Sequence, residues 1–357
     1  MNKLLLALLL FLLSFSWIKV TASDSCPASF PWKAQWINTE RCQSATNTWL
    51  IYRKSFAVTD VPNQLIARIA ADSKYWLWIN DQLVVFEGGL KRGPSPSGTY
   101  YDPVDIAPYL TKGSNTIAIL LWHFGKDGFS HINSGKAALL FEAIAPGLEI
   151  VSDASWQCAL YEAYQNTEAP FPNYRMPESN IRFDARQSIT NWNRTSFEGS
   201  LPGAVCVGKA GKAPFGDLVE RPIPQWKNSG LLSYVSVRES LKGDTLFCRL
   251  PYNAQITPYL KVEAEAGKTI HIRMDNYEGG SERNVRAEYI TREGEQEYES
   301  YGWMNGHEVY YIIPKGVKVL DVKYRETGYN TDLAGSFHCD DPFYDELWQR
   351  SARTLYI

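Results

Sequence analysis

The stretch "QLIARIAADSKYWLWINDQLVVFEGG", residues 64–89, predicts the fold class. Two runs rich in β-branched and aromatic residues flank Asn80-Asp81, a dipeptide suited to a tight hairpin turn. Similar runs lie at 48–58, 115–125 and 136–144, and glycine and proline mark the connections between them. We therefore predict an antiparallel β-sandwich of the jelly-roll kind over residues 30–150.

Strand patterns weaken after this region and return near residue 230. The segment 151–229 is rich in proline, as in "APFPNYRMPES" and "ERPIPQW", and we predict an irregular connector packed on the first sandwich. From 230 to 337 short strands resume. Ile270 and Ile272 alternate there with His271 and Arg273, as expected when one sheet face is buried and the other is solvated. These features predict a second antiparallel β-sandwich and an all-β protein.

Residues 338–357 predict a short C-terminal helix. Asp341 can cap the free amides, and Pro342 fits the first turn, where its missing N–H costs nothing. Phe343, Leu347 and Trp348 then recur at helical spacing. The pattern reaches Ile357 without the glycine or asparagine that often ends a helix. We interpret it as a truncated helix whose apolar side would pack against a partner.

The N-terminus predicts a secretory signal peptide over residues 1–22. Lys3 precedes an apolar run from Leu4 to Leu13, and the small Ala22 comes before a polar segment. The run is too short for a comfortable membrane span, so we expect a secreted or periplasmic protein without a transmembrane segment. Cys26 follows "SDS", a poor lipobox, and we do not expect a lipoprotein.

The cysteines lie beyond this segment, in a compartment that permits disulfides. There are 6 of them, and they show no CxxC spacing of the kind that binds zinc. Cys26 and Cys42 are the most plausible bridge because the loop between them is short. The sequence leaves the full pairing open.

The composition excludes one class of partner and raises the possibility of another. The formal net charge of -3 lacks the basic excess of a nucleic-acid-binding protein, and we expect no nucleic-acid partner. The chain holds 12 Trp and 21 Tyr. Such aromatic residues fill β-sheet cores, and at a surface they also stack on sugar rings.

Several segments together resemble the N-terminal accessory domains of bacterial α-L-rhamnosidases of glycoside hydrolase family 78. They are "WKAQWI", "YWLWINDQLV", "EAGKTIHIRMDNYEGG", "VKVLDVKYRETGY" and "GSFHCDDPFYDELWQRSARTL". The resemblance implies a galactose-binding-like jelly roll, a second sandwich, and the first helix of an (α/α)6 catalytic barrel. It covers nearly all of the chain after the signal peptide.

The resemblance also implies a function. It points to an exported glycoside hydrolase that acts on rhamnose-containing oligosaccharides or polysaccharides, with inversion and without a metal or organic cofactor. In that family the catalytic acids lie in the six-hairpin barrel, beyond the last residue of this sequence. No catalytic position is therefore carried over, and we expect this chain to be inactive alone. The alternative is a stand-alone carbohydrate-binding protein.

Aromatic residues and histidines are the candidate sugar contacts. Trp76 stands two residues from Trp78, so both project from one sheet face. It is either a core residue or an exposed sugar platform. Trp122-His123 ends a strand next to a loop. The pair either packs in the core or contacts a bound sugar. Trp303 and His307 flank "MNG", which we interpret as an exposed hairpin turn that reaches a substrate or covers the seam between domains.

Charged residues give weaker candidates. The resemblance suggests that Glu278, Arg283 or Arg286 could line the rim of a complete active site. The acids near them, Glu282 and Glu288 included, are expected to be solvated. The histidines show no metal-ligand spacing, and no GxSxG or phosphate-binding glycine loop is present. We predict neither a metal site nor a nucleophilic enzyme.

Overall fold

A computed structural model describes residues 31–42, 44–89, 98–128, 131–169, 180–277 and 285–356. The signal peptide, Cys26, Glu278, Glu282, Arg283 and Ile357 lie outside these ranges. The described chain is almost entirely β-structure with one short C-terminal helix, so the predicted all-β class with two sandwiches is confirmed. Within the described ranges no helical segment combines the length and the apolar character of a membrane span.

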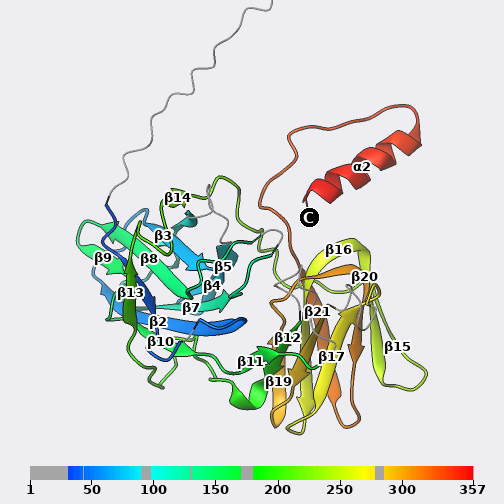
Figure 1. Cartoon of the computed structure of the whole chain (residues 1–357). Coiled ribbons are helices and arrows are strands. Elements are labelled where there is room, and N and C mark those ends of the chain that lie inside the picture. Colours follow the sequence, from blue (N-terminus) through cyan, green and yellow to red (C-terminus); the bar gives the residue numbers. More distant parts are fainter. Residues whose placement is uncertain are drawn as a thin grey trace, which may run out of the picture. The chain divides into compact units, whose positions relative to one another are not determined.

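The first sandwich is built from two sheets (Figure 1). One has the order β13-β1-β8-β3-β6-β14, with β9 paired to β8. Its strands are Gln35–Asn38 (β1), Ile66–Asp72 (β3), Thr99–Asp105 (β6), Ala138–Ala145 (β8), Leu148–Val151 (β9), Val205–Lys209 (β13) and Leu218–Glu220 (β14). The other has the order β10-β2-β7-β4-β5. Its strands are Thr48–Val58 (β2), Lys74–Ile79 (β4), Gln82–Gly89 (β5), Gly113–His123 (β7) and Gln157–Leu160 (β10).

Strand β4 shows how the sequence forms this sandwich. Tyr75, Leu77 and Ile79 point into the core between the two sheets. Asn80 and Asp81 then have φ values of 46° and 72°, the left-handed conformation that a tight hairpin turn requires. The turn predicted between β4 and β5 is therefore confirmed.

The second sandwich is organised around one long strand, with which four other described strands pair. Its strands are Tyr164–Asn166 (β11), Ile181–Asp184 (β12), Ser236–Glu239 (β15), Thr245–Ala264 (β16), Thr269–Met274 (β17), Arg286–Ile290 (β18), Gly294–Glu299 (β19), Met304–Ile312 (β20) and Lys318–Glu326 (β21). The order is β11-β12-β18-β17-β20-β16-β15, with β19 and β21 also paired to β16. The pairing of β16 with β20 shifts register between Arg249 and Ala254. Because of this irregularity, the first half of β16 pairs with β15 and the second half with β19 and β21.

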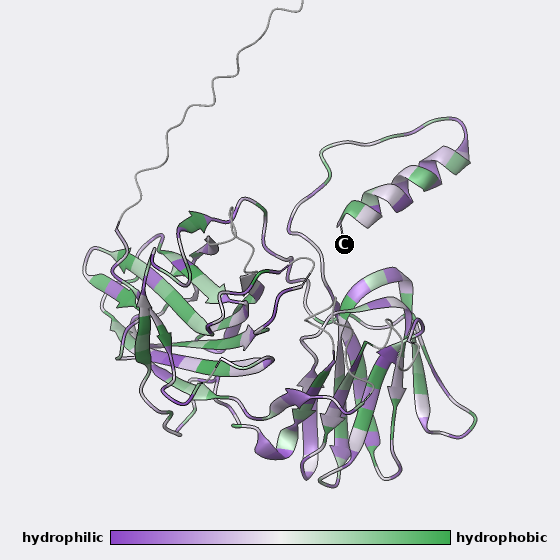
Figure 2. Ribbon diagram, in the orientation of Figure 1, coloured by the Kyte–Doolittle hydropathy of each residue, from purple (hydrophilic) through white to green (hydrophobic). Residues whose placement is uncertain are grey.

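The strands of the second sandwich alternate between buried and solvated residues. Ile270, Ile272 and Met274 are buried, while His271 and Arg273 face outward, as the sequence predicts. Figure 2 shows the alternation as bands of both colours along these strands. One face of this sheet therefore packs in the core and the other meets solvent.

The segment 151–229 differs from the predicted irregular connector. It supplies β10, β13 and β14 to the first sandwich, and β11 and β12 to the second. Two of these strands pair in parallel, β14 with β6 and β12 with β18, which an antiparallel description omits. Strands of 3 to 5 residues carry too little periodicity to be recognised within proline-rich sequence. Their pairing is decided by the sheet edges to which they add.

The helix α2 spans Pro342–Tyr356 and begins as predicted. The Asp341 carboxylate accepts a hydrogen bond from the Phe343 backbone N–H at 3.0 Å, which satisfies one of the free amides of the first turn. At its C-terminal end, Arg353 lies 3.5 Å from Glu326 of β21. Phe343 and Leu347 remain exposed.

Candidate functional site

Trp76 and Trp122 lie in the interior. Both indole side chains are at most 1% exposed, and they belong to a buried aromatic cluster. Trp49 stacks between them, with ring centroids 6.0 Å from Trp76 and 4.5 Å from Trp122. Tyr301 covers Trp76 with its ring centroid 4.5 Å away. The structure thus leaves Trp76 and Trp122 no face for a sugar and assigns them to packing.

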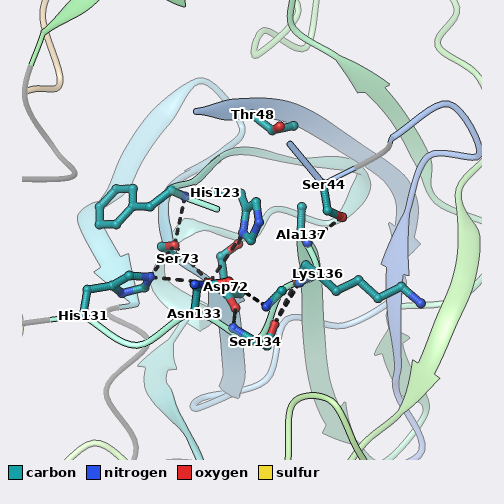
Figure 3. Close-up of polar contacts among 12 residues, drawn as sticks. Ser44, Thr48, Asp72, Ser73, His123, His131, Asn133, Ser134, Lys136 and Ala137 are labelled. Carbon is teal, nitrogen blue, oxygen red and sulfur yellow. Dashed lines mark hydrogen bonds and ion pairs between the residues drawn. The ribbon is translucent and has the colours of Figure 1, made fainter. Parts of the chain in front are cut away.

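His123 belongs to a buried polar cluster that ties three strand ends together (Figure 3). Its Nδ1 lies 3.1 Å from the Asp72 carbonyl oxygen, and because a carbonyl can only accept, Nδ1 carries the proton. Ser73 Oγ donates to Asp72 Oδ1 at 3.0 Å and lies 3.2 Å from His131 Nε2. The Ser134 N–H donates to Asp72 Oδ2 at 2.6 Å.

This Asp72 cluster contains serine, histidine and aspartate, but its geometry is not that of a nucleophilic site. Asp72, Ser73, His123 and His131 are all at most 1% exposed, so no substrate reaches Ser73 Oγ. Ser73 Oγ donates its proton to the Asp72 carboxylate and not to His131 Nε2, so the serine-to-histidine-to-aspartate order of a catalytic relay is not formed here. Burial raises the pKa of Asp72, but hydrogen bonds from His123 and Ser134 outweigh it and hold the pKa below its ordinary value. The cluster therefore has a structural role: it joins the ends of neighbouring strands by buried hydrogen bonds.

Trp303 lies at the seam between the sandwiches. Its indole Nε1 donates to Glu87 Oε2 at 2.6 Å, and the Lys74 ammonium lies 3.5 Å from its ring centroid. Lys74 and Glu87 form an ion pair of 2.7 Å whose side chains are 0% and 1% exposed. Of the two roles that the sequence allowed for Trp303, the structure shows the seam contact.

The prediction of an exposed hairpin turn at "MNG" is wrong. Met304 begins β20, and Gly306 packs so closely that a Cβ atom would lie 2.2 Å from Asp275 Oδ1. The turn signal failed because this glycine serves close packing and not chain reversal. His307 is well exposed, and its Nδ1 lies 3.6 Å from Asp275 Oδ2.

Arg286 and Glu288 lie on the outer face of β18 and are both buried. Glu288 is 1% exposed and accepts hydrogen bonds from Arg182 at 2.8 Å and from Arg286 at 3.1 Å. The expectation that Glu288 is a solvated acid is therefore wrong, because two arginines enclose it. Arg286 is only 5% exposed and also donates a hydrogen bond to the Glu168 carbonyl oxygen. Its guanidinium is therefore occupied by contacts within this chain.

A pocket of about 350 Å³ opens next to this buried network, and we call it the polar pocket after the charged side chains in its wall. The lining residues among those described are Glu168, Ala169, His271, Arg273, Tyr277, Arg286, Glu288 and Ile312. Arg182 hydrogen-bonds Glu168 and lowers the pKa of that carboxyl. Burial lowers the pKa of His271, although Glu288 opposes this. The pocket thus combines ion-paired carboxylates with a histidine that burial keeps more readily neutral.

A line of arginine and aromatic side chains crosses the same face. Cross-strand pairing places Arg273 of β17 opposite Tyr310 of β20, Tyr310 opposite Phe247 of β16, and Phe247 opposite Arg238 of β15. The Arg238 guanidinium lies 4.0 Å from the Phe247 ring centroid, and Arg273 lies 4.7 Å from that of Tyr277. We call these five residues the arginine–aromatic face.

This face was not predicted from the sequence, although a signal was present. Arg273 was assigned to the solvated side of its strand, but the neighbouring strands that place aromatic rings beside it were not paired. Phe247 and Tyr310 form an edge-to-face pair with centroids 5.0 Å apart, and both side chains are half-buried. Only the register brings residues 238, 247, 273 and 310 into one row.

The described residues contain no group of three or more histidine, cysteine or acidic side chains placed to hold a metal ion. Cys42, Cys158, Cys206, Cys248 and Cys339 are free thiols, and the proposed partner of Cys42 lies outside the described residues.

Comparison with known proteins gives matches in structure alone. No family model and no curated protein sequence matches the chain. A GH78 family rhamnosidase of Bacillus sp. GL1 superimposes with a TM-score of 0.78 at 17% identity, covering 91% of this chain and 58% of that one. The α-L-rhamnosidase from Dictyoglumus thermophilum gives 0.66 at 20% identity, over 89% of this chain and 38% of that one.

A third structure agrees with these two. The α-L-rhamnosidase from Aspergillus terreus also gives a TM-score of 0.66 at 20% identity, over 88% of this chain and 38% of its own. This chain therefore spans between about two fifths and three fifths of the lengths of these three enzymes. Its two sandwiches have the fold found in part of the GH78 α-L-rhamnosidases, as expected for the N-terminal portion of such an enzyme.

Proposed function

We propose that this chain is the non-catalytic N-terminal part of an exported α-L-rhamnosidase-like glycoside hydrolase. The observation that supports the proposal most strongly is the asymmetry of the structural matches. Nearly the whole chain superimposes on rhamnosidases of which 42% to 62% remains unmatched, since it covers 58% and 38% of them. The chain would supply a scaffold and contacts to rhamnose-containing glycans, while a six-hairpin helical barrel would supply the acid and the base.

The chemistry of the polar pocket supports a non-catalytic role. Glycoside hydrolysis needs one carboxyl group that is protonated at working pH and a second that is ionised. The pocket holds two carboxylates, Glu168 and Glu288, but Arg182 bonds both. Because Arg182 lowers the pKa of Glu168, that group is a poor proton donor.

The buried seam supports a scaffold role. Lys74, Glu87 and Trp303 join the first sandwich to the second, and Phe86 of β5 lies 4.7 Å from the Arg325 guanidinium of β21. A seam with a buried ion pair and close cation–π contacts favours one fixed arrangement over a flexible linker. A fixed pair of sandwiches suits the support of a neighbouring domain.

An assay of two purified proteins tests the proposal. The present chain and a version extended by a helical barrel are each offered an aryl α-L-rhamnoside, and release of the aryl group is followed by absorbance. We expect turnover by the extended protein and none by the present chain. Turnover by the present chain would contradict the non-catalytic role, and an extended protein that is folded but inactive would contradict the rhamnosidase assignment. Under this proposal, the DNA after the codon for Ile357 is expected to encode the barrel used in the extended version.

The arginine–aromatic face favours a second candidate, a stand-alone carbohydrate-binding protein. Half-buried rings beside guanidinium groups suit the apolar faces and hydroxyl groups of a sugar. This candidate predicts glycan binding by the present chain and no rhamnosidase activity in any extended form.

A further inference from the structure

The arginine–aromatic face is built to hold a ligand along the strand-pairing direction. Neighbouring strands lie about 4.8 Å apart, so the three steps from Arg273 through Tyr310 and Phe247 to Arg238 span roughly 14 Å. The two rings at the centre are half-buried and offer apolar surface. Each end of the row carries an arginine. An extended ligand with apolar faces and negative charge matches this row.

The two arginines differ in how their charge is used. The Arg238 guanidinium is 61% exposed and lies 3.3 Å from the carboxylate of Glu308, which is 20% exposed. Arg273 has no hydrogen bond or ion pair with an acid among the described residues, and its Nε is buried without a hydrogen-bond partner. A buried donor without an acceptor is costly unless a ligand or water completes it. Within the described part of the chain, the Arg273 guanidinium is therefore the group in this row that lacks a hydrogen-bond acceptor.

The polar pocket adjoins Arg273 and gives the acceptor a place. Arg273 and Tyr277 both line it. The other arginines nearby, Arg182 and Arg286, are already bonded to Glu288. A carboxylate that enters here would meet the guanidinium of Arg273, whose planar fork matches two carboxylate oxygens.

We propose that the outer face of the second sandwich binds an acidic glycan, with a uronate carboxylate on Arg273 and sugar rings against Tyr310 and Phe247. The binding site extends the proposed glycan-handling role of the chain but needs no rhamnosidase activity. Binding and turnover are separate measurements, so failure of one proposal is distinguishable from failure of the other. Carboxylate recognition also explains why the row carries arginine at both ends on a chain whose net charge is -3.

Calorimetric titration of the purified full chain with a short oligogalacturonate tests the site, and the fully methyl-esterified oligomer serves as the neutral probe. We expect the free acid to bind and the ester to bind about tenfold more weakly or not at all. Raising the salt concentration should weaken binding of the acid more than binding of the ester. A chain that binds neither probe, or both equally, would overturn the proposal.

Variants locate the site. Arg273→Gln should weaken binding of the acid about tenfold, and Arg273→Lys, which keeps the charge but loses the fork, should give an intermediate loss. Phe247→Ala should weaken both probes. Arg350→Gln on α2, where the side chain is 76% exposed, is the matched control and should bind as the wild type does. Equal losses in Arg273→Gln and Arg350→Gln would show general charge attraction and refute the site, and the melting temperature of each variant confirms its folding.

Discussion

The buried ion pair at the seam gives the sharpest test of the tertiary structure. Lys74 and Glu87 lie 2.7 Å apart on neighbouring strands, and both side chains are shielded from water. The indole of Trp303 contacts both, through a hydrogen bond to Glu87 and through its ring face to the ammonium. The perturbation is Lys74→Met, which keeps most of the side-chain volume and removes the charge.

The expected cost follows from the burial of the carboxylate that remains. Removing one partner of a buried pair leaves an uncompensated charge and costs about 3–5 kcal/mol. For a chain of this size, each kcal/mol lowers the melting temperature by about 2 °C, so the shift should be at least roughly 6 °C. The double variant Lys74→Met/Glu87→Gln removes both charges and keeps an acceptor for Trp303. It should recover at least half of the loss, because an apolar or neutral replacement of a buried pair is often close to neutral.

Thermal and urea unfolding of the four proteins supplies the measurement. Lys112→Met, at an exposed position of the first sandwich, is the control and should change the free energy of unfolding by less than about 0.5 kcal/mol. A loss below about 1 kcal/mol in Lys74→Met would show that the pair is solvated. A double variant that is no more stable than the single one would show that the damage comes from packing and not from charge.

Three further predictions concern other parts of the chain. Asp72 has a depressed pKa, so it should add stability above its unfolded value near 3.8, and this contribution should disappear as the pH falls through the lower folded value. The gap in melting temperature between wild type and Asp72→Asn should therefore narrow in acid, and a gap that is constant from pH 7 to pH 2 would contradict the assignment. Asp341→Ala should weaken the start of α2 by about 1 kcal/mol, seen as faster hydrogen exchange of the Phe343 amide, while exchange in β20 stays unchanged. Gly88→Ala places a Cβ atom 2.2 Å from the Tyr75 ring and should cost about 1–3 kcal/mol in urea unfolding, whereas Gly203→Ala, with open space around it, should be nearly neutral.

Local sequence predicted the features that depend on neighbouring residues. The turn at Asn80-Asp81, the alternation along β17 and the Asp341 cap each arise within a few residues of chain, and the structure shows all three. Backbone dihedral preference, the two-residue period of a strand and helix capping are local effects. These effects can be predicted from a short stretch of sequence without knowledge of the rest of the fold.

Tertiary structure decided what covers each face. The period of β4 places Trp76 and Trp78 together, but it does not tell whether that face meets water or a second layer. Tyr301, more than 200 residues away, covers Trp76 and removes it from the candidate sugar contacts. In the same way, Trp303 reaches Glu87 across a separation of 216 residues.

The candidate site also has features that the sequence predicts and features that only the tertiary structure determines. The alternation along the sequence placed Arg273 on the solvated side of a strand, and the family resemblance suggested Arg286 as a rim residue of a complete active site. Pairing between strands that are distant in the sequence then put Arg182 against Glu288. It also put Tyr310 next to Arg273 and Phe247 next to Tyr310. A pattern along one strand determines which side each residue takes, whereas the register between strands determines its neighbours. Long-range pairing therefore determined the neighbours of Arg273 on the proposed binding surface.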